Sequence, residues 1–390
     1  MRLLLIITFV GLISNVQSQN WDQLTNFPGG SRDDGCSFTI DNVVYCGTGR
    51  DSSFAMQPDF YSFNLLTEQW DTIGAMPFAT RRQYSSSATY NSEGYVFGGF
   101  NHFGEYLNDL WRYSPTTNSW DYLGQAPFEG RSGMQSFVIG QIFFVVGGRT
   151  ANQVATNEVW GYHFVDHTWQ SFSPVPGDGI WRGFGVVNGD IGIVGMGSDS
   201  TNSKRGEIYF YDLALDQWTY DPSIDTEPMT YPAAGMINNR LLLYGGEDTL
   251  GVNRNDFRYL DISTMTWNTM NSFPQEARRG VMTFCSSSDF YITTGLTSTT
   301  RINETWVARS VASKDEVEQI SNLHVYVSND IVTITGDVEA FHMYNGYGAE
   351  IPLISIAPGK FQLPAGLPVG MYICTGFEEG KMLNGKLIIQ

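Results

Sequence analysis

Six tryptophans recur at a nearly constant interval, and this interval constrains the fold more than any other feature of the sequence. Their successive spacings are 49, 50, 49, 49 and 49 residues. A period of this length is typical of a repeat architecture in which each repeat is one supersecondary unit. The period therefore predicts six units. The tryptophans are Trp21, Trp70, Trp120, Trp169, Trp218 and Trp267.

The sequence of each unit predicts four short β-strands. Two β-rich runs flank a tight turn such as Gly140-Gln141, which is typical of a β-hairpin. The second run ends in glycines such as Gly147-Gly148, which permit a positive φ and close approach of neighbouring units. The third run places an aromatic residue, such as Tyr162, seven positions before the next tryptophan. We expect these rings to pack between adjacent sheets.

The repeat resembles the Kelch motif, over about residues 21–310. The resemblance implies a β-propeller of four-stranded blades. No tryptophan follows Ala308 by seven residues, whereas Trp21 begins a strand that has nothing before it. We therefore expect Trp21 to complete the last blade of an all-β, six-bladed Kelch propeller over residues 19–310. In the third unit the motif reads Arg131, Gly147-Gly148, Trp160-Gly161-Tyr162, Trp169 and Pro176.

The two ends of the chain lie outside the repeat. Residues 1–18 have a positive start, an apolar run and small residues at the end, which is the pattern of a signal peptide. Residues 311–319 are polar and are expected to form a linker. Residues 320–390 contain six or seven short apolar runs separated by glycine and proline, which predicts a small Ig-like β-sandwich.

This C-terminal segment resembles the type A sorting domain of the type IX secretion system of Bacteroidetes. It departs from that family at residues 326–330, where a Tyr-Pro-Asn-Pro-like start is usual. The resemblance implies a partner in the secretion machinery, and a bacterial protein that is secreted or displayed on the outer cell surface. An ordinary Ig-like binding module is the alternative. The matching pieces are Asp330–Ile334, Tyr344-Asn345-Gly346, Leu367–Tyr372 and Gly385–Ile389.

Charge and residue spacing exclude several classes of function. The chain has 40 acidic and 22 basic residues, for a net charge of −18, which argues against nucleic acid as a partner. The apolar run of the first 18 residues is too short to span a membrane, and no later apolar run is long enough to predict a transmembrane segment. Neither the five histidines nor the four cysteines have metal-ligand spacing, so no metal and no cofactor are expected. Buried thiols are favoured over disulfides, although disulfides remain an alternative.

Five arginines stand near the start of a unit's first predicted strand, 15 or 16 residues before its glycine site. In an acidic chain they would form a local positive ring at the channel mouth, which suits bidentate binding of carboxylate or sulfate. The alternative is structural, because an arginine here could pair with the backbone or a carboxylate of a neighbouring unit. The five are Arg32, Arg82, Arg131, Arg182 and Arg278.

Trp181 falls outside the 49-residue period and lies beside Arg182. Exposed, it would be an aromatic surface for a sugar or a peptide side chain. Buried, it would fill the inside of its own loop. Both interpretations stay open at this point.

No catalytic constellation is visible, and Kelch propellers are mostly binding platforms. We therefore expect an exported binding protein, not an enzyme, that holds a glycan, peptide or envelope ligand of anionic character on one face. The alternative is a sugar-acid epimerase or mutarotase similar to the N-acetylneuraminate epimerase family. A loop acid such as Glu158 or Glu207 would then move the proton.

Overall fold

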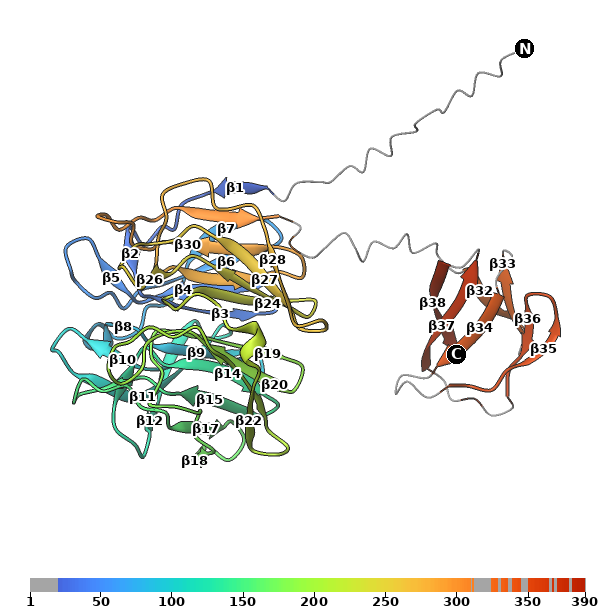
Figure 1. The fold of residues 1–390 in the computed structure, drawn as a ribbon, viewed down its shortest axis with the longest axis horizontal. Coiled ribbons are helices and arrows are strands. Elements are labelled where there is room, and N and C mark those ends of the chain that lie inside the picture. The colour runs from blue at the N-terminus through green and yellow to red at the C-terminus, as the bar shows by residue number, and fades with distance from the viewer. Residues whose placement is uncertain are drawn as a thin grey trace, which may run out of the picture. The chain divides into compact units, whose positions relative to one another are not determined.

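The computed structural model describes residues 20–309 and 311. In the C-terminal part it describes 324–328, 331–335, 339–344, 350–364, 367, 370–378 and 381–389. The predicted signal peptide, and all of the predicted linker except Val311, lie outside the described residues. The chain divides into two compact units, Met1–Ala312 and Ser313–Gln390, and each is described by itself (Figure 1). No described helix is long and apolar enough to cross a membrane.

The described part of the first unit is built from antiparallel sheets of four main strands. The first sheet contains β3 (Cys36–Ile40), β4 (Val43–Gly47), β6 (Phe60–Asn64) and β7 (Gln69–Thr72). The second contains β9 (Ser86–Tyr90), β10 (Glu93–Asn101), β11 (Tyr106–Ser114) and β12 (Ser119–Gln125). The third contains β14 (Gln135–Ile139), β15 (Ile142–Val146), β17 (Val159–His163) and β18 (Thr168–Phe172).

Three further sheets follow the same pattern. The fourth contains β19 (Phe184–Asn188), β20 (Ile191–Gly195), β21 (Ile208–Asp212) and β22 (Gln217–Tyr220). The fifth contains β24 (Ala233–Ile237), β25 (Arg240–Tyr244), β27 (Phe257–Asp261) and β28 (Thr266–Thr269). The sixth contains β29 (Met282–Cys285), β30 (Phe290–Thr293), β31 (Thr305–Ala308) and, from the other end of the repeat, β1 (Trp21–Leu24).

Short two-residue strands and 3-10 turns connect these sheets. β8 (Arg82–Gln83) extends the second sheet by pairing with β10. The separate pairs are β2 (Arg32–Asp33) with β5 (Arg50–Asp51), β13 (Arg131–Ser132) with β16 (Arg149–Thr150), and β23 (Met229–Thr230) with β26 (Glu247–Asp248). The 3-10 turns are η1 (Phe78–Thr80) and η2 (Pro222–Ile224).

The strand register follows the tryptophan pattern of the sequence. Trp21 of β1 lies opposite Ala308 of β31, so the first strand of the repeat region completes the last sheet. The seven-residue spacing between the third-strand residue and the tryptophan is confirmed, since the two are direct cross-strand partners. The pairs are Phe63 with Trp70, Tyr113 with Trp120, Tyr162 with Trp169, Tyr211 with Trp218, and Leu260 with Trp267.

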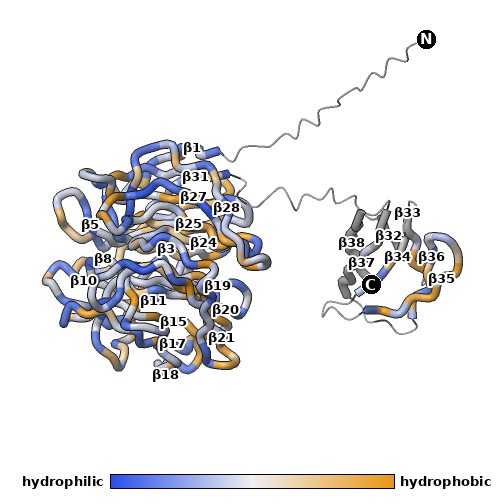
Figure 2. The backbone as a smooth tube through the Cα atoms, in the orientation of Figure 1, coloured by the Kyte–Doolittle hydropathy of each residue, from blue (hydrophilic) through white to orange (hydrophobic). Residues whose placement is uncertain are grey.

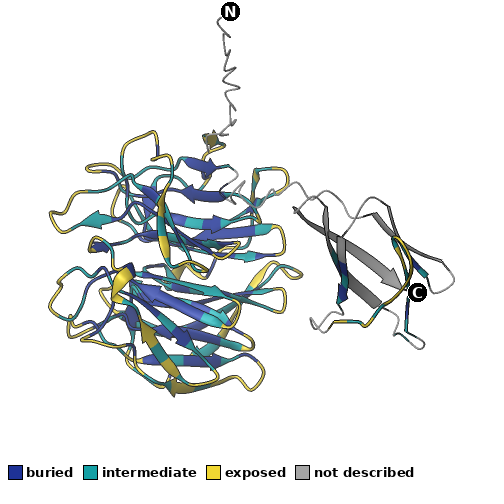
Figure 3. Cartoon of the chain, turned by 45° about the vertical axis from the view of Figure 1, so that its right-hand side comes forward, coloured by how far each residue is buried: buried dark blue, intermediate teal, exposed yellow. Residues whose placement is uncertain are grey.

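The sheets pack face to face around a cycle. The first strand of each sheet contacts the first strand of the next, and β29 of the sixth sheet contacts β3 of the first. Second strands such as β25 and β30 are therefore buried at every position, whereas β22 and β28 at the outer edges are mostly exposed (Figure 3). Figure 2 shows the corresponding hydrophobic segments along the strands, for example near β15.

The periodic tryptophans lie at the margins of the hydrophobic clusters and not inside them. All six are partly exposed, and each packs against a different cluster of buried residues. Several also donate the indole N–H to a backbone carbonyl of the preceding unit. Trp218 reaches Ser173 at 2.8 Å, and Trp21 reaches Asn271 at 3.0 Å. Each tryptophan therefore links two neighbouring sheets as well as filling space.

The four cysteines are free thiols, and Ser37 rather than Cys36 faces Cys46 across the first hairpin.

In the second unit, one sheet contains β32 (His324–Ser328), β33 (Ile331–Thr335), β36 (Lys360–Gln362) and β35 (Ile354–Ala357). The other contains β34 (Glu339–Tyr344), β37 (Gly370–Glu378) and β38 (Lys381–Ile389). Their apolar cluster includes Val332, Met343 and Cys374. The Ig-like and sorting-domain assignments stay predictions.

Candidate functional site

Four of the five predicted arginines are buried, with exposed fractions of 0 to 2%. Each forms an ion pair with a carboxylate 26 or 27 residues later in the chain. Arg32, Arg82 and Arg131 also donate to the carbonyl 16 residues ahead. These contacts engage the guanidinium groups in structural roles, but the partners belong to the arginine's own unit and not to a neighbouring unit as the structural alternative expected. The ion pairs are Arg32–Asp59 at 2.7 Å, Arg82–Asp109 at 2.7 Å, Arg131–Glu158 at 2.7 Å and Arg278–Glu304 at 2.8 Å.

The fifth predicted arginine, Arg182, occupies a different repeat position. The residue 49 after Arg131 is Ile180, and the next equivalent is Met229, so two units lack this arginine. There an arginine two residues before the carboxylate takes its place. These substitutes are Arg205 with Glu207 at 3.4 Å and Arg254 with Asp256 at 3.2 Å.

Arg182 belongs instead to a set of six equivalent residues that we term the axial ring. They are spaced by 50, 49, 49, 49 and 49 residues, and all have φ between 57° and 66°. The backbone N–H of one donates to the carbonyl of the preceding one, for instance Arg182 to Gly133 at 2.7 Å and Asp34 to Gly280 at 2.8 Å. The last bond joins the sixth sheet to the first. The axial ring comprises Asp34, Tyr84, Gly133, Arg182, Tyr231 and Gly280.

The left-handed backbone makes the side chains of this ring informative. A residue other than glycine in this conformation costs roughly 1–2 kcal/mol, and such residues cluster at functional sites. Two positions of the ring are glycine, which removes the strain. The other four retain a carboxyl, a guanidinium or a phenol group. This retention is the first sign of a site at the axis.

The ring residues line a small axial pocket of about 160 Å³. Arg182 Nη2 donates to the Tyr84 hydroxyl at 3.0 Å, and its guanidinium carbon lies 4.6 Å from the centre of the Tyr231 ring. The guanidinium of Arg279 lies 4.5 Å from the same ring, and its Nε pairs with Glu247 at 3.0 Å. Arg182 forms no ion pair with any carboxylate in the described part of the chain.

Asp34 supplies an acid to the same pocket. Its side chain is 7% exposed, and Oδ1 has no hydrogen-bond partner among the described residues. Burial, followed by the charge of Asp33, raises the pKa of Asp34 to about 7, although Arg182, a hydrogen bond from Tyr84 and Arg279 act in the opposite direction. A buried oxygen without a hydrogen-bond partner destabilises the folded state unless another group donates a hydrogen bond to it. The pocket therefore combines the Arg182 guanidinium with a titratable carboxyl group.

Trp181 is buried, with 5% of its surface exposed. Of its two interpretations, this burial favours the one in which the ring fills the inside of its own loop. The guanidinium carbons of Arg182 and Arg149 lie 3.9 Å and 4.6 Å from its ring centre. Its indole N–H has no partner within the described residues. It stacks against the Arg182 guanidinium and presents no exposed ring to a sugar.

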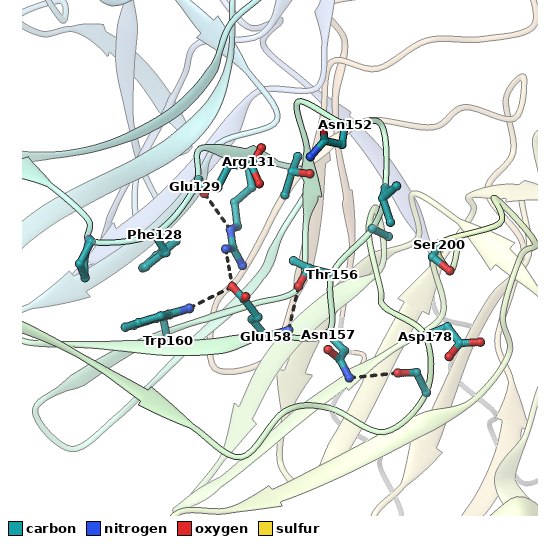
Figure 4. Close-up of a pocket in the computed structure, with 15 residues that line it drawn as sticks. Phe128, Glu129, Arg131, Asn152, Thr156, Asn157, Glu158, Trp160, Asp178 and Ser200 are labelled. Carbon is teal, nitrogen blue, oxygen red and sulfur yellow. Dashed lines mark hydrogen bonds and ion pairs between the residues drawn. The ribbon is translucent and has the colours of Figure 1, made fainter.

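A larger cleft of about 860 Å³ lies beside the third sheet (Figure 4). Arg131 and Trp160 both donate to Glu158, at 2.7 and 3.2 Å. Burial raises the pKa of Glu158, but the hydrogen bonds from Arg131 and Trp160 outweigh it and keep the net pKa low. Glu129 and Asp178 also line the cleft and are exposed. Arg131 is the one arginine among the described residues that line this cleft, and it is paired, so the cleft is acidic and disfavours an anion.

The other predicted proton-transfer residue, Glu207, lines a neighbouring cleft of about 430 Å³. It accepts from Arg205 at 3.4 Å and from the backbone of Gly206 at 3.1 Å. Asp178, Asp199 and Asp225 share this cleft. Neither Glu158 nor Glu207 therefore lies with the unpaired cation of the axial pocket. Within the described residues, no group of three His, Cys, Asp or Glu side chains is placed to hold a metal ion.

Known proteins share both the repeat and the fold. Residues 10–180 match the family model of the KLHDC2/KLHL20/DRC7 Kelch-repeats domain. The solved structure of YjhT matches 80% of this chain and 99% of its own, with a TM-score of 0.63 and 18% identity. That likeness concerns the fold. Together the two matches support an all-β, Kelch-repeat, propeller-like fold.

Two curated relatives carry the name of an enzyme. N-acetylneuraminate epimerase 2 of Escherichia coli O6:H1 is 25% identical over 292 residues, which is 60% of this chain and 79% of the relative. N-acetylneuraminate epimerase of Escherichia coli K12 is 25% identical over 296 residues, with coverages of 62% and 80%. These names match the alternative that the sequence offered better than they match a binding protein.

Sequence reasoning missed most of the axial pocket. It named Arg182 for a different repeat position, and it passed over Asp34, Tyr84 and Tyr231. The sequence did contain a signal: the same 49-residue period also applies to the positions two residues after the recurring arginine. The left-handed backbone, which makes four of those side chains unusual, is visible only in three dimensions.

Proposed function

We propose that the first unit is a sugar-acid mutarotase or epimerase, which interconverts the anomers of a sugar bearing a carboxylate. The observation that carries the proposal is the axial pocket, which is lined by both Arg182 and the buried acid Asp34. The names of the curated relatives support this function over the exported binding protein expected from the sequence.

Electrostatics favour the axial pocket over the larger cleft as the place of a sugar acid. A carboxylate about 4 Å from one guanidinium gains on the order of 4 kcal/mol at an effective dielectric constant of 20. Arg182 offers that attraction because it has no ion pair in the described chain. In the larger cleft, Glu129, Glu158 and Asp178 would repel the same anion. The charge signs therefore assign the substrate carboxylate to Arg182.

The size of the pocket limits which part of the substrate it holds. Pockets for whole small molecules usually measure about 300–1,000 Å³, whereas this one measures about 160 Å³. We therefore place only the carboxylate and the adjacent anomeric centre inside it. The remainder of the sugar extends into the mouth formed by the surrounding loops.

We also propose the finer architecture and location. The six sheets would be the blades of one closed six-bladed propeller, with β1 completing the sixth. The second unit would be a type IX sorting domain, and the mature chain would begin at residue 19 and reach the cell surface or the medium. Support for the location comes only from the sequence patterns described above.

Anomer exchange of N-acetylneuraminate, followed by proton NMR, tests the proposed function. The wild-type protein should accelerate exchange, whereas the exchange of glucose, which has no carboxylate, should keep its uncatalysed rate. Arg182→Gln should raise KM roughly 10- to 100-fold, because a hydrogen bond to a charged group is lost. Gln, like Arg, has a Cβ, so the backbone strain at this position is unchanged.

Arg81→Gln is a matched control. It removes the same charge from a guanidinium whose recorded partners, among the described residues, are the Phe78 ring and carbonyl and the Phe103 ring. It should leave KM unchanged. An exchange rate in the presence of wild-type protein equal to that in buffer would exclude the proposed function.

A further inference from the structure

We propose that the larger cleft beside the third sheet is a second binding site, which takes a neutral saccharide. This inference goes beyond the proposed function, because the described residues that line the cleft and those that line the axial pocket are different. The cleft volume of about 860 Å³ falls in the range usual for sites that hold a whole small molecule. Two adjacent units form the cleft, with residues from the segments 127–131, 150–160 and 177–178 and with Ser200.

One side of the cleft is formed by Phe128 and Trp160, which we term the aromatic pair. Their ring centres lie 4.7 Å apart at an interplanar angle of 23°, and both side chains are partly exposed. The Trp160 indole N–H donates to Glu158 at 3.2 Å, which fixes the orientation of the ring. Aromatic side chains offer a large, rigid contact area at a low cost in conformational entropy. The apolar C–H face of a sugar ring can pack against such a surface.

The repeated fold does not require the aromatic pair. Aromatic residues occupy both positions in the second and third units only. In the second unit Phe78 is 70% exposed and contacts Arg81, whereas in the third Phe128 packs on Trp160. A stacked pair that the other units fold without is better explained by a ligand than by stability. The equivalents of Phe128 are Gly29, Phe78, Gly177, Thr226 and Gln275, and those of Trp160 are Tyr61, Trp111, Tyr209, Arg258 and Trp306.

The polar groups of the cleft suit the hydroxyl groups of a sugar. Glu129 and Asp178 are exposed, and no described residue forms a hydrogen bond or an ion pair with either carboxylate. Each carboxylate has two oxygens that can accept from neighbouring sugar hydroxyls. Asn152 and Ser200 add an amide and a hydroxyl donor. In Figure 4, Asp178 and Ser200 lie on the opposite side of the cleft from the aromatic pair. A saccharide between the two sides would contact both.

The charge of the lining indicates a neutral saccharide. Glu129, Glu158 and Asp178 repel an anion, and Arg131 does not compensate because it is 1% exposed and already paired with Glu158. A cationic ligand gains little, because water screens its attraction to exposed carboxylates. Ring packing and hydrogen bonds therefore determine which ligand binds. A sugar acid is directed to the axial pocket instead.

Hydrogen bonds hold the walls of the cleft in place without a ligand. Asn157 Nδ2 donates to the Gly177 carbonyl at 3.1 Å, which joins the segments from two units (Figure 4). The Thr156 backbone donates to Gly148 at 2.9 Å and accepts from Ile180 at 3.1 Å. Binding would consequently order few groups of the protein, which lowers its entropic cost.

A glycan array that carries neutral and sialylated oligosaccharides, probed with the full chain, tests the inference. We expect the cleft to bind neutral glycans. Trp160→Ala should then weaken the affinity for the strongest neutral glycan, measured by calorimetry, by roughly 10-fold or more. Trp111→Ala is the matched control, because it removes the equivalent indole, which donates to Asp109 at 2.7 Å, from outside the cleft. It should leave that affinity unchanged.

Asp178→Asn provides a second variant with little risk to the fold, because no described residue pairs with this carboxylate. It should weaken the affinity for the same glycan roughly 3- to 10-fold, since charge-assisted hydrogen bonds are replaced by neutral ones. Wild-type affinity in both Trp160→Ala and Asp178→Asn would overturn the assignment of the site to this cleft.

The array also tests the ligand class. Stronger binding of amine-bearing glycans than of their N-acetylated forms would overturn the neutral class. A wild-type protein that binds no neutral glycan but accelerates the anomer exchange of N-acetylneuraminate would overturn this inference alone. Neutral glycan binding that depends on Trp160, together with exchange at the uncatalysed rate, would support this inference and overturn the proposed function.

Discussion

The carboxyl group of Asp34 should make the stability of the fold depend on pH, whether or not the protein is an enzyme. Burial, followed by the charge of Asp33, raises the pKa of Asp34 from the usual aspartate value of about 3.9 to about 7 in the folded protein. Between these values the folded state holds a proton that the unfolded state has released. Stability therefore falls as pH rises from about 4 to 7 and stays level above 7.

Urea unfolding of the wild type and of Asp34→Asn at pH 5, 6, 7 and 8 measures this effect. The wild type should lose on the order of 2–3 kcal/mol relative to the variant between pH 5 and 7, at about 1.4 kcal/mol for each pKa unit. Both proteins share every other titrating group, so the difference isolates Asp34. A difference that stays constant over this range would show that Asp34 is ionised at pH 5 in the folded protein.

Also at the residue scale, two arginines of adjacent units show what residue spacing cannot predict. Arg131 and Arg182 both precede a first strand, and counting to the glycines makes them look equivalent. The structure separates them by two residues, which turns Arg131 into a buried partner of Glu158 and places Arg182 in the axial pocket. Unit lengths vary by one residue, so spacing alone cannot resolve a two-residue shift.

Among the structural elements, the repeated arginine–carboxylate pair joins a unit's first strand segment to its third strand. In the third unit, Arg131 is 1% exposed, whereas Glu158 is 53% exposed. Removal of the exposed partner leaves a buried charge without compensation, and removal of the buried partner leaves a carboxylate that water can solvate. The two halves of the pair should therefore differ in their effect on stability.

Denaturant unfolding of single variants measures this asymmetry. Glu158→Ala should cost about 3 kcal/mol, the low end for an uncompensated buried charge. Arg131→Met should cost roughly 1–2 kcal/mol, because the apolar stem is retained and water solvates the remaining acid. Met229 already occupies the equivalent position of the fifth unit. Glu129→Ala, an exposed control, should stay within about 0.5 kcal/mol. Equal costs for Glu158→Ala and Arg131→Met would refute the argument from burial.

The strands and their pairing are the part of this fold that sequence predicts best. Alternating apolar residues, tight turns and a fixed tryptophan spacing identify the four strands of a unit, and the cross-strand partners of the tryptophans follow from the spacing. The short pairs, such as β2 with β5, carry no such pattern, because two residues are too few to show a period. Their residues nevertheless position the axial ring.

At the scale of the whole molecule, the axial ring and the axial pocket depend on the closed cycle of sheets. β1 contributes the fourth strand of the sixth sheet, in register from Trp21 opposite Ala308 to Leu24 opposite Thr305. Trp21 also packs within 5.8 Å of the rings of Tyr244, Phe257 and Phe273 of the fifth unit. One short strand therefore holds the two ends of the repeat together.

Deletion of residues 20–24 should consequently destabilise the whole first unit and not only its edge. The lost contacts of Trp21 alone are worth about 3 kcal/mol, and the three strands left in the sixth sheet would expose an unpaired edge. We expect a lower urea midpoint, and loss of N-acetylneuraminate binding well before complete unfolding, because Asp34 and Gly280 meet across this closure.

A chain that ends at Ala312 is the control, since it retains Val311, which is buried in the cluster of the last two sheets. It should unfold at the wild-type midpoint. An unchanged midpoint after deletion of β1 would mean that the sheets close without it, and that the axial pocket has some other support.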